Sequence, residues 1–241
     1  MYILVSGAAS GLGRAFVDTY RNDPNNHIFA VDRISLLEHD NPWMDATNVE
    51  QHRVDVTNEA DITSFAQIVK DQPIDLFIHS AGIRGLVPAV EDARPDNVAA
   101  AETLEVMDVE TMMRTYQINA LGTFLLIRAM LPNLMQSKYR KVVVMTSRMG
   151  SLGYNTTGSA YAYRASKAAL NAIVKSFSID VPEVTFIMNH PGRVESKLVK
   201  YKEEGAISAE ESVKGLIPLI ERWGKSDSGK FFDRFGSPIE W

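Results

Sequence analysis

The chain has 241 residues, a formal net charge of −5 and no cysteine. The lack of cysteine excludes disulfides, thiol catalysis and zinc sites with cysteine ligands, and it fits a reducing compartment. Lysine and arginine are not concentrated in any stretch, so we expect no nucleic-acid partner. The composition, 45% hydrophobic and 23% charged, is typical of a globular protein. This length suits one α/β domain spanning residues 1–241.

The apolar runs are too short to predict a membrane span. The first run, residues 1–5, has no basic leader and continues directly into glycines. It therefore predicts a buried strand and not a signal peptide. We expect a cytoplasmic protein that does not bind a membrane.

A glycine-rich turn lies between a predicted strand, residues 2–6, and a predicted helix, residues 14–21. Its spacing is Gly-x-x-x-Gly-x-Gly. The first glycine permits a tight turn, the second lets the backbone approach a pyrophosphate, and the third lets the helix pack close to the sheet. Free N–H groups and the helix dipole would then hold the phosphates; the alternative is a flexible surface loop. The residues expected at this site are Gly7, Ser10, Gly11, Leu12 and Gly13.

Asp32 ends the second predicted strand, residues 27–32, and Arg33 follows it. A carboxylate at this position can accept hydrogen bonds from the adenosine ribose and repel a 2′-phosphate, which favours NAD. The Arg33 guanidinium could instead receive that phosphate. We give the carboxylate more weight, so the sequence predicts that NAD(H) is the favoured cofactor over NADP(H). The alternative is an ordinary ion pair at a solvated turn.

Residues 52–56 predict a third strand that ends at Asp55 and Val56. Asp55 could accept a hydrogen bond from the adenine amino group. Equally, Asp55 or Asn58 could only cap the helix predicted over residues 59–70.

A fourth predicted strand, residues 74–79, leads into Ser80, Ala81 and Gly82. Small residues at a strand end let a flat ligand approach the backbone, so we expect these three at the cofactor. After a poorly patterned stretch, residues 98–107 predict a short helical piece.

A long helical pattern covers residues 108–136 and ends near Pro132. Asn119 lies inside it, among apolar neighbours. A buried amide needs a hydrogen-bond partner. Asn119 is therefore either a site residue or one that only satisfies backbone groups.

Residues 141–146 predict the most apolar strand, and Ser147 follows its end, where open parallel sheets bind ligands. Ser147 could hydrogen-bond a substrate oxygen; the alternative is a turn serine. Tyr163 and Lys167 lie four residues apart on the next predicted helix, which continues to about residue 179. The ammonium is expected to lower the tyrosine pKa, so that the phenol exchanges a proton with a carbonyl or alcohol. Tyr161 is a weaker candidate because no lysine follows it at this spacing.

Another predicted strand, residues 184–189, leads to His190, which we interpret as structural. Pro191 and Gly192 form a turn whose backbone could meet the nicotinamide amide, and Val194 is expected beside it. Charged residues follow, and residues 193–207 predict a substrate lid.

The last predicted elements are a helix over residues 209–223, capped by Ser208, and a strand over residues 229–233. The tail, residues 235–241, could close over a site or pack on a partner subunit. Strands and helices alternate throughout. This order predicts a doubly wound parallel sheet of about seven strands, flanked by helices, in a single Rossmann-fold domain.

These motifs resemble the short-chain dehydrogenase/reductase family along essentially the whole chain. The long loop before Tyr163 and residues 236–241 are similar to a carbonyl-reductase branch related to C-factor proteins. The residues that carry the resemblance are Ser6 to Gly13, Asp55-Val56-Thr57, Ser80-Ala81-Gly82, Asn119, Ser147, Tyr163 with Lys167, and Pro191-Gly192.

The resemblance implies a catalytic tetrad of Asn119, Ser147, Tyr163 and Lys167. Ser147 would orient the substrate oxygen, and Tyr163 would donate a proton in reduction and accept one in oxidation. Lys167 would bind the nicotinamide ribose, and Asn119 would hold a water for proton exchange. Hydride would pass between the cofactor and a secondary alcohol or ketone, and no metal is required.

The chain departs from the family pattern at His79-Ser80, where the family usually has Asn-Asn, and we expect weakened or altered bracing between strands. The implied partners are a small alcohol or carbonyl substrate and a second copy, in a homodimer or homotetramer formed through the helices of Asn119 and Tyr163. An alternative function is a dinucleotide-sensing regulatory or signalling protein without turnover.

Overall fold

The protein is described by a computed structural model that covers residues 1–34, 43, 45–201 and 203–241. In this part of the chain, seven parallel strands form one sheet in the order β3-β2-β1-β4-β5-β6-β7. The fold class is therefore as predicted. The strands are β1 (Tyr2–Ser6), β2 (His27–Asp32), β3 (Val49–Arg53), β4 (Leu76–His79), β5 (Lys141–Met145), β6 (Thr185–Asn189) and β7 (Lys230–Phe232).

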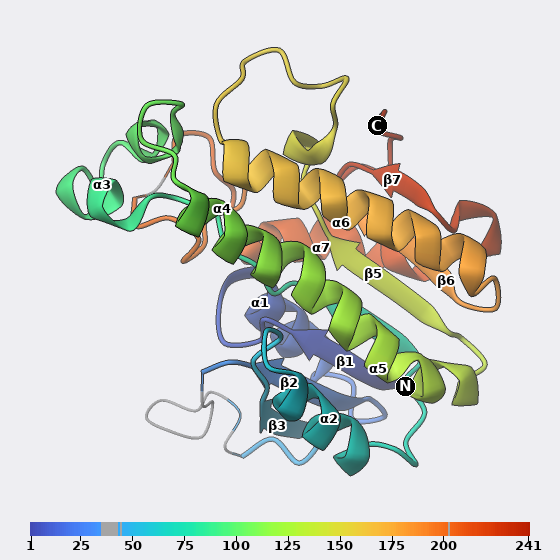
Figure 1. The fold of residues 1–241 in the computed structure, drawn as a ribbon. Helices are drawn as coiled ribbons and strands as arrows, with labels where there is room; N and C mark the ends of the chain where they lie inside the picture. The colour runs from blue at the N-terminus through green and yellow to red at the C-terminus, as the bar shows by residue number, and fades with distance from the viewer. Residues whose placement is uncertain (35–42, 44, 202) are drawn as a thin grey trace.

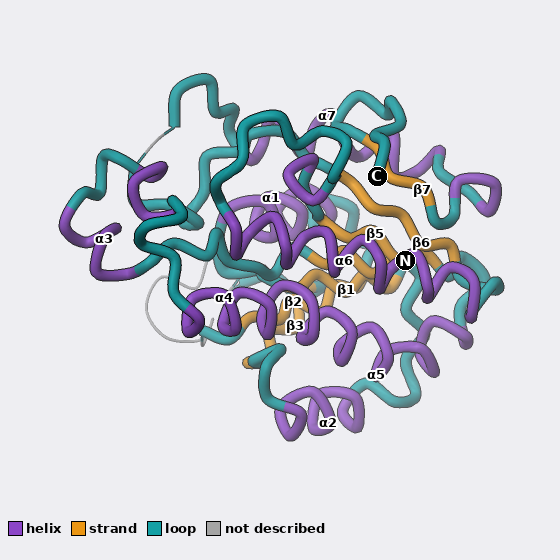
Figure 2. The backbone as a smooth tube through the Cα atoms, turned by 45° about the horizontal axis from the view of Figure 1, so that its top comes forward, coloured by secondary structure: helices purple, strands orange, loops and turns teal. Residues whose placement is uncertain are grey.

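Helices cover both faces of this sheet (Figure 1). The α-helices are α1 (Gly11–Tyr20), α2 (Glu59–Ile68), α3 (Pro88–Ala93), α4 (Val109–Tyr116), α5 (Thr123–Gln136), α6 (Tyr161–Asp180) and α7 (Ala209–Arg222). Figure 2 shows α4, α5 and α6 along one side of the strands, with α1 and α7 beyond them. The short helical turns are Val98–Glu102, Gln117–Gly122, Arg148–Gly150 and Lys225–Asp227.

The two faces of β1 belong to two separate hydrophobic clusters. Leu4 packs in the cluster that contains side chains of α2, α5 and α6. Ile3 and Val5 pack in the cluster that contains side chains of α1 and α7. Because side chains alternate along a strand and both faces are covered, the central strands read as unbroken apolar runs.

The third strand begins earlier than predicted. β3 spans Val49–Arg53, and not residues 52–56, with Asp32 of β2 opposite Arg53. It lies at the edge of the sheet, so its sequence is mostly polar, whereas the apolar Val54 and Val56 lie beyond its end. Asp55 consequently lies in the turn after the strand.

The helical run from Val109 to Gln136 is also different from the prediction. It contains a π-helical turn, Gln117–Gly122, and it continues through Pro132. Asn133 donates hydrogen bonds to the carbonyl oxygens of Val69 and Gln72, at 2.6 and 2.9 Å, which holds the last turn in place. Tertiary contacts therefore override the local effect of the proline. The piece predicted over residues 98–107 is a short 3₁₀ turn, Val98–Glu102.

This same run, Val109–Gln136, is long and apolar enough to cross a membrane by length and composition, contrary to the expectation from the sequence. Within its most apolar window, 56% of the residues are buried inside the protein. A helix that packs in a protein core meets the same criteria, so this feature is weak evidence for a membrane span.

The C-terminal elements form as expected, and the tail packs on its own chain. Ser208 caps α7 by accepting a hydrogen bond from the Glu211 nitrogen at 3.0 Å. The Trp241 ring stacks on Phe231 of β7 with 5.9 Å between the centroids. The Trp241 carbonyl accepts a hydrogen bond from Gly153, so the tail also contacts the loop that precedes α6.

Candidate active site

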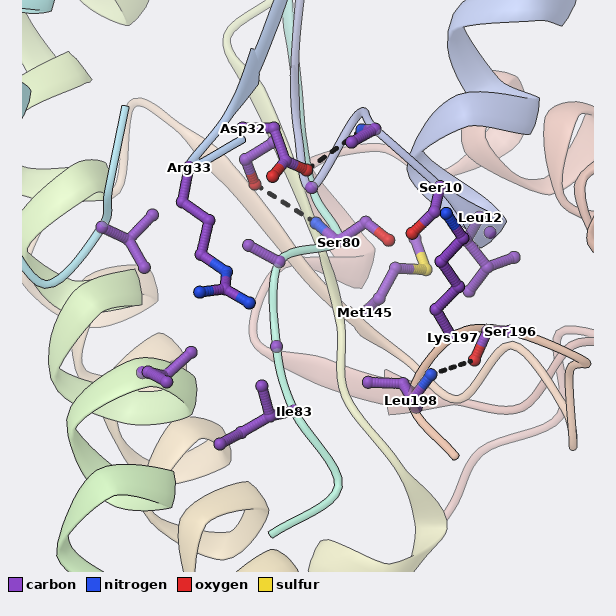
Figure 3. Close-up of a pocket in the computed structure, with 18 of the residues that line it drawn as sticks. Ser10, Leu12, Asp32, Arg33, Ser80, Ile83, Met145, Ser196, Lys197 and Leu198 are labelled. Atoms are coloured by element: carbon purple, nitrogen blue, oxygen red, sulfur yellow. Dashed lines mark hydrogen bonds between the residues drawn. The ribbon is translucent and has the colours of Figure 1, made fainter. Parts of the chain in front are cut away.

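A cavity of about 430 Å³ lies at the carboxyl ends of the strands, where the strand order reverses between β1 and β4 (Figure 3). Open α/β sheets bind their ligands at such a point. Most of the residues singled out in the sequence line this cavity. They are Gly7, Ser10, Gly11, Leu12, Asp32, Arg33, Asp55, Val56, Ser80, Ala81, Gly82, Ser147, Tyr163, Lys167, Pro191, Gly192 and Val194.

The glycines of the first turn are required by close backbone contacts. Gly7 has a φ of +71°, and a β-carbon there would lie 2.7 Å from the Ala81 nitrogen. A β-carbon on Gly13 would lie 2.1 Å from the Gly7 carbonyl oxygen. Gly13 therefore lies beneath the turn and outside the cavity lining, where it allows α1 to approach β1, as the sequence predicts.

The N-terminus of α1 offers free hydrogen-bond donors to the cavity. Its N-cap, Ser10, makes no capping hydrogen bond with its side chain, and the first turn has no acidic residue. Unpaired N–H groups and the helix dipole favour an anion at this position. α1 begins at Gly11, three residues before the predicted start, so these N–H groups belong to the glycine turn itself. The residues present fit the pyrophosphate of a dinucleotide.

Asp32 and Arg33 both line the cavity at the end of β2. The Asp32 carboxylate accepts hydrogen bonds from the nitrogens of Ala9, at 3.0 Å, and Ile34, at 3.1 Å. The Arg33 side chain extends from the strand end into the cavity (Figure 3). The carboxylate is thus fixed beside the glycine turn, while the guanidinium reaches further out, and both alternatives from the sequence stay structurally available.

Asp55 also lines the cavity, and it does not cap α2. Asn58 is the cap, because its side chain accepts a hydrogen bond from the Ala60 nitrogen at 3.0 Å. The Asp55 carboxylate accepts from the hydroxyl and the nitrogen of Thr57, at 2.7 and 2.9 Å. Burial works to raise the pKa of Asp55, but these hydrogen bonds hold it below its usual value.

His79 stands where the family usually has an asparagine, and its fully buried ring forms hydrogen bonds to side chains of two other elements, β1 and α5. Its Nδ1 lies 2.8 Å from the Ser6 hydroxyl, and its Nε2 lies 2.8 Å from the Thr123 hydroxyl. The Thr123 hydroxyl donates to the Asn119 carbonyl, so it must accept from Nε2–H, and the Ser6 hydroxyl donates to Nδ1. Burial, with help from the charge of Lys167, lowers the pKa of His79 to about 3. The bracing between strands is therefore altered, and it depends on a neutral imidazole.

Asn119 lies in the π-helical turn with its side chain fully engaged. Its Oδ1 accepts from the Ile83 nitrogen at 2.8 Å. Its Nδ2 donates to the Ile83 carbonyl at 2.9 Å and to the Ser166 hydroxyl at 3.0 Å. The side chain thus satisfies backbone groups, which is one of the two alternatives that the sequence offers for Asn119. It fixes the loop after β4 against α6, and its role in holding a water stays a prediction.

Ser147, Tyr163 and Lys167 all line the cavity, and Tyr163 is hydrogen-bonded to Ser147. The Lys167 ammonium lies 5.7 Å from the centroid of the Tyr163 ring and donates to the Met145 carbonyl at 3.0 Å. Burial lowers the pKa of Lys167 to about 8. Tyr161, the weaker candidate, does not line the cavity and is 39% exposed. A hydroxyl, a phenol and an amine that line the same cavity this close together can bind and protonate a substrate oxygen.

The expected lowering of the Tyr163 pKa by Lys167 is wrong as a net effect. Burial raises the pKa of Tyr163 above its ordinary value. The charge of Arg84 and a hydrogen bond with Ser147 oppose this rise. The sequence did not single out Arg84, because its proximity to Tyr163 depends on the path of the loop after β4.

The segment after β6 completes the cavity. A β-carbon on Gly11 would lie 3.2 Å from the Ser196 side chain, which shows how closely this segment approaches the glycine turn. Residue 202 of the predicted lid, residues 193–207, lies outside the described residues. His190 lines the cavity, and burial, more than the nearby charge of Arg148, lowers its pKa to about 4.

Ser6, Ala9 and Thr57, which the sequence named only as parts of the family motifs, also line the cavity, as do Ser196, Lys197 and Leu198 of the predicted lid. Other lining residues were not singled out, because neighbouring strands and loops bring them to the cavity: Val31, Ile34, Val54, Ile83, Ile118, Met145 and Thr146. The strand residues could have been found from their place beside the motifs, because strand ends of a parallel sheet share one edge.

Comparisons with known proteins agree with this geometry. Residues 1–206 match the model of the short chain dehydrogenase family. The C-signal of Myxococcus xanthus is 39% identical over 180 residues, which cover 74% of this chain and 99% of that protein. The 1-hydroxy-2-glutathionyl-2-methyl-3-butene dehydrogenase of Rhodococcus sp. (strain AD45) is 32% identical over 194 residues, 78% of each chain.

A solved structure has the same fold over the whole chain. The NADPH-bound carbonyl reductase from chicken fatty liver superimposes with a TM-score of 0.84 at 25% identity, covering 100% of this chain and 98% of that one. The chain belongs to the short-chain dehydrogenase family, and it is an enzyme of the short-chain dehydrogenase/reductase class.

Proposed function

We propose that this enzyme transfers a hydride between a nicotinamide cofactor and a secondary alcohol or ketone, with Tyr163 as the general acid/base. The observation that carries the proposal is a single cavity lined both by the glycine turn at the N-terminus of α1 and by Ser147, Tyr163 and Lys167. The similarity to a carbonyl reductase supports the same reaction class.

Ser147, Tyr163 and Lys167 each have a distinct chemical task. A bound nicotinamide supplies or accepts the hydride. The Ser147 hydroxyl donates a hydrogen bond to the substrate oxygen, which holds it next to Tyr163. In reduction, the proton moves from the Tyr163 hydroxyl to that oxygen, and in oxidation it moves back.

Lys167 would act through charge and through a hydrogen bond to the cofactor ribose. Its ammonium is buried, and its present partner is the Met145 carbonyl at 3.0 Å. Because burial lowers its pKa to about 8, the amine changes charge just above neutral pH. Such a group can pass on the proton that Tyr163 gains or loses.

Replacement of Tyr163 by phenylalanine tests this function. The ring keeps its packing, but no hydroxyl remains to exchange a proton with the substrate. We expect Tyr163→Phe to lose turnover across a panel of ketones and secondary alcohols and to retain cofactor binding. A fully active variant would show that another group is the acid/base.

NAD(H) is proposed as the favoured cofactor, on the basis of the fixed Asp32 carboxylate. Two backbone nitrogens hold this carboxylate at the cavity edge, where it would meet a ribose 2′-oxygen. Arg33 and the NADPH bound by the chicken carbonyl reductase favour the opposite choice. Asp32→Ala should therefore bind NADPH more tightly and NADH more weakly, whereas unchanged affinities would show that Asp32 does not select the cofactor.

A second candidate function is dinucleotide sensing without turnover, in a regulatory or signalling protein. The similarity to a protein named C-signal is the observation that favours it. A carbonyl and alcohol screen distinguishes the two functions. Tight dinucleotide binding with no turnover on any substrate would favour sensing, and turnover on any ketone would favour the enzyme.

A cytoplasmic homodimer or homotetramer is proposed as the working state. Apolar side chains on α4 and the following turn are exposed, among them Val109, Met113 and Leu121. Burying such side chains against a second copy is favourable. Light scattering should give a dimer or tetramer mass, and cell fractionation should place the protein in the cytoplasm; a monomer or a membrane fraction would contradict these proposals.

A further inference from the structure

A buried ion pair lies next to the proposed acid/base, on the segment that follows β4. The Arg84 Nε and Nη2 groups donate to the two carboxylate oxygens of Glu102, each at 2.9 Å. The side chains are only 16% and 9% exposed. Two parallel charge-assisted hydrogen bonds fix both the position and the plane of the guanidinium.

The guanidinium is directed at the phenol ring of Tyr163. Its central carbon lies 4.9 Å from the ring centroid, closer than the ammonium of Lys167 at 5.7 Å. Its remaining Nη1 group contacts the Met149 sulfur at 3.3 Å. A cation over the ring face is attracted to the ring, and it favours negative charge on the phenol oxygen.

Glu102 is itself held by the chain that begins the catalytic helix. Its carbonyl oxygen accepts hydrogen bonds from the Ala160 nitrogen and the Ser159 hydroxyl, both at 2.9 Å. Ser159 and Ala160 have φ values of +56° and +51°, in the left-handed region that residues other than glycine seldom adopt. The loop containing Glu102 therefore fixes the start of α6 and Arg84 together.

We propose that Arg84, held by Glu102, is a positioning residue that places a fixed positive charge on the ring of Tyr163 and so favours its phenolate. The proposal rests on the function proposed above for Tyr163. It assigns to a residue outside the tetrad part of the electrostatic task that the sequence assigned to Lys167.

The charges that face Tyr163 come from four elements. Lys167 lies on its own helix, Arg84 on the segment after β4, Glu102 on a 3₁₀ turn, and Glu203 after β6. Burial is the largest influence and raises the Tyr163 pKa. The Arg84 charge is the largest opposing influence, and Glu102 and Glu203 oppose it more weakly. Loss of Arg84 should therefore raise the pKa further.

The test is the pKa of the Tyr163 phenol in Arg84→Met, measured by NMR on protein labelled at the tyrosine ζ-carbon. The Tyr163 resonance is assigned by its absence in Tyr163→Phe. We expect an upward shift of about one pH unit, because a cation at 4–6 Å shifts a pKa by about one to three units and Glu102 offsets part of this. The pH profile of turnover should move in the same direction.

Two further variants keep the test decisive if Arg84→Met does not fold. Arg84→Met combined with Glu102→Gln leaves no unpaired buried charge, and it should also raise the pKa, by less. Arg84→Lys retains a charge without the paired hydrogen bonds, and it should restore part of the wild-type value. Arg128→Met is the matched control, because Arg128 lies over the Phe124 ring at 5.1 Å, away from the cavity.

The outcomes separate this inference from the proposed function. A Tyr163 pKa that rises without Arg84 supports the inference, whether or not Tyr163→Phe is active. A pKa that is unchanged in both the single and the double variant overturns the inference, even if Tyr163→Phe is inactive. An equal shift in Arg128→Met would also overturn it, since the effect would then not depend on the arginine lying next to Tyr163.

Discussion

The neutral His79 bridge predicts a stability that depends on pH in a specific way. In the folded protein His79 is fully buried, with Ser6 and Thr123 on its two nitrogens and a pKa near 3. In the unfolded chain its pKa is about 6.5. Between these values the unfolded chain binds a proton that the folded protein does not. The stability from the neutral form is therefore present above about pH 6.5, and it is lost as the pH falls toward the folded-state pKa.

The size of the effect follows from these two pKa values. Each pH unit below about 6.5 should lower the free energy of unfolding by about 1.4 kcal/mol. At about pH 5 the loss from this group is thus roughly 2 kcal/mol relative to pH 7.5. His79→Leu also removes two hydrogen bonds and leaves the Ser6 hydroxyl without its acceptor. At about pH 7.5 it should therefore be less stable than the wild type by about 2–4 kcal/mol.

Urea unfolding at several pH values measures both effects. His79→Gln is the matched variant, because its amide has a donor and an acceptor but does not titrate. Both variants should lack the part of the pH slope that comes from His79, so their deficit relative to wild type should shrink by roughly 2 kcal/mol between about pH 7.5 and pH 5. A deficit that stays constant over this range would refute the neutral, buried assignment of His79.

Two other predictions concern the glycine turn and the catalytic lysine. Gly13→Ala should lose dinucleotide binding and destabilise the fold by about 1–3 kcal/mol, because its β-carbon would lie 2.1 Å from the Gly7 oxygen; Gly215→Ala, which has nothing within 4 Å, is the control. Lys167→Met should lose turnover, yet near neutral pH it should raise the free energy of unfolding by about 2 kcal/mol. The gain arises because burial of the charged amine, which depresses its pKa to about 8, destabilises the folded wild type. Loss of the hydrogen bond to the Met145 carbonyl offsets part of this gain. Calorimetry and activity assays check both. A destabilised Lys167→Met, or a Gly13→Ala protein that binds normally, would contradict these expectations.

Local patterns were sufficient for the parts of the site that lie at strand ends. The glycine turn, Asp32, Ser147 and the Tyr163–Lys167 pair were predicted because each follows an apolar strand or lies on one helix face. Parallel strands share an edge, so these residues had to converge.

The parts that were missed depend on long-range contacts. The edge strand β3 has few apolar residues, so its sequence did not mark its start. The proline in α5 is tolerated because Asn133 is anchored on another segment. The pairing of Arg84 with Glu102 joins residues 18 positions apart in a stretch without clear periodicity. No local rule in the sequence predicts that contact.

The central claim is that one cavity binds a dinucleotide against the glycine turn and presents it to Tyr163. The most direct test is a fluorescence titration of the purified protein, first with NADH and then with NADPH, following the nicotinamide emission. We predict saturable binding of both, with NADH bound more tightly. Binding of neither would contradict the account, because the glycine turn and the open end of α1 would then have no ligand.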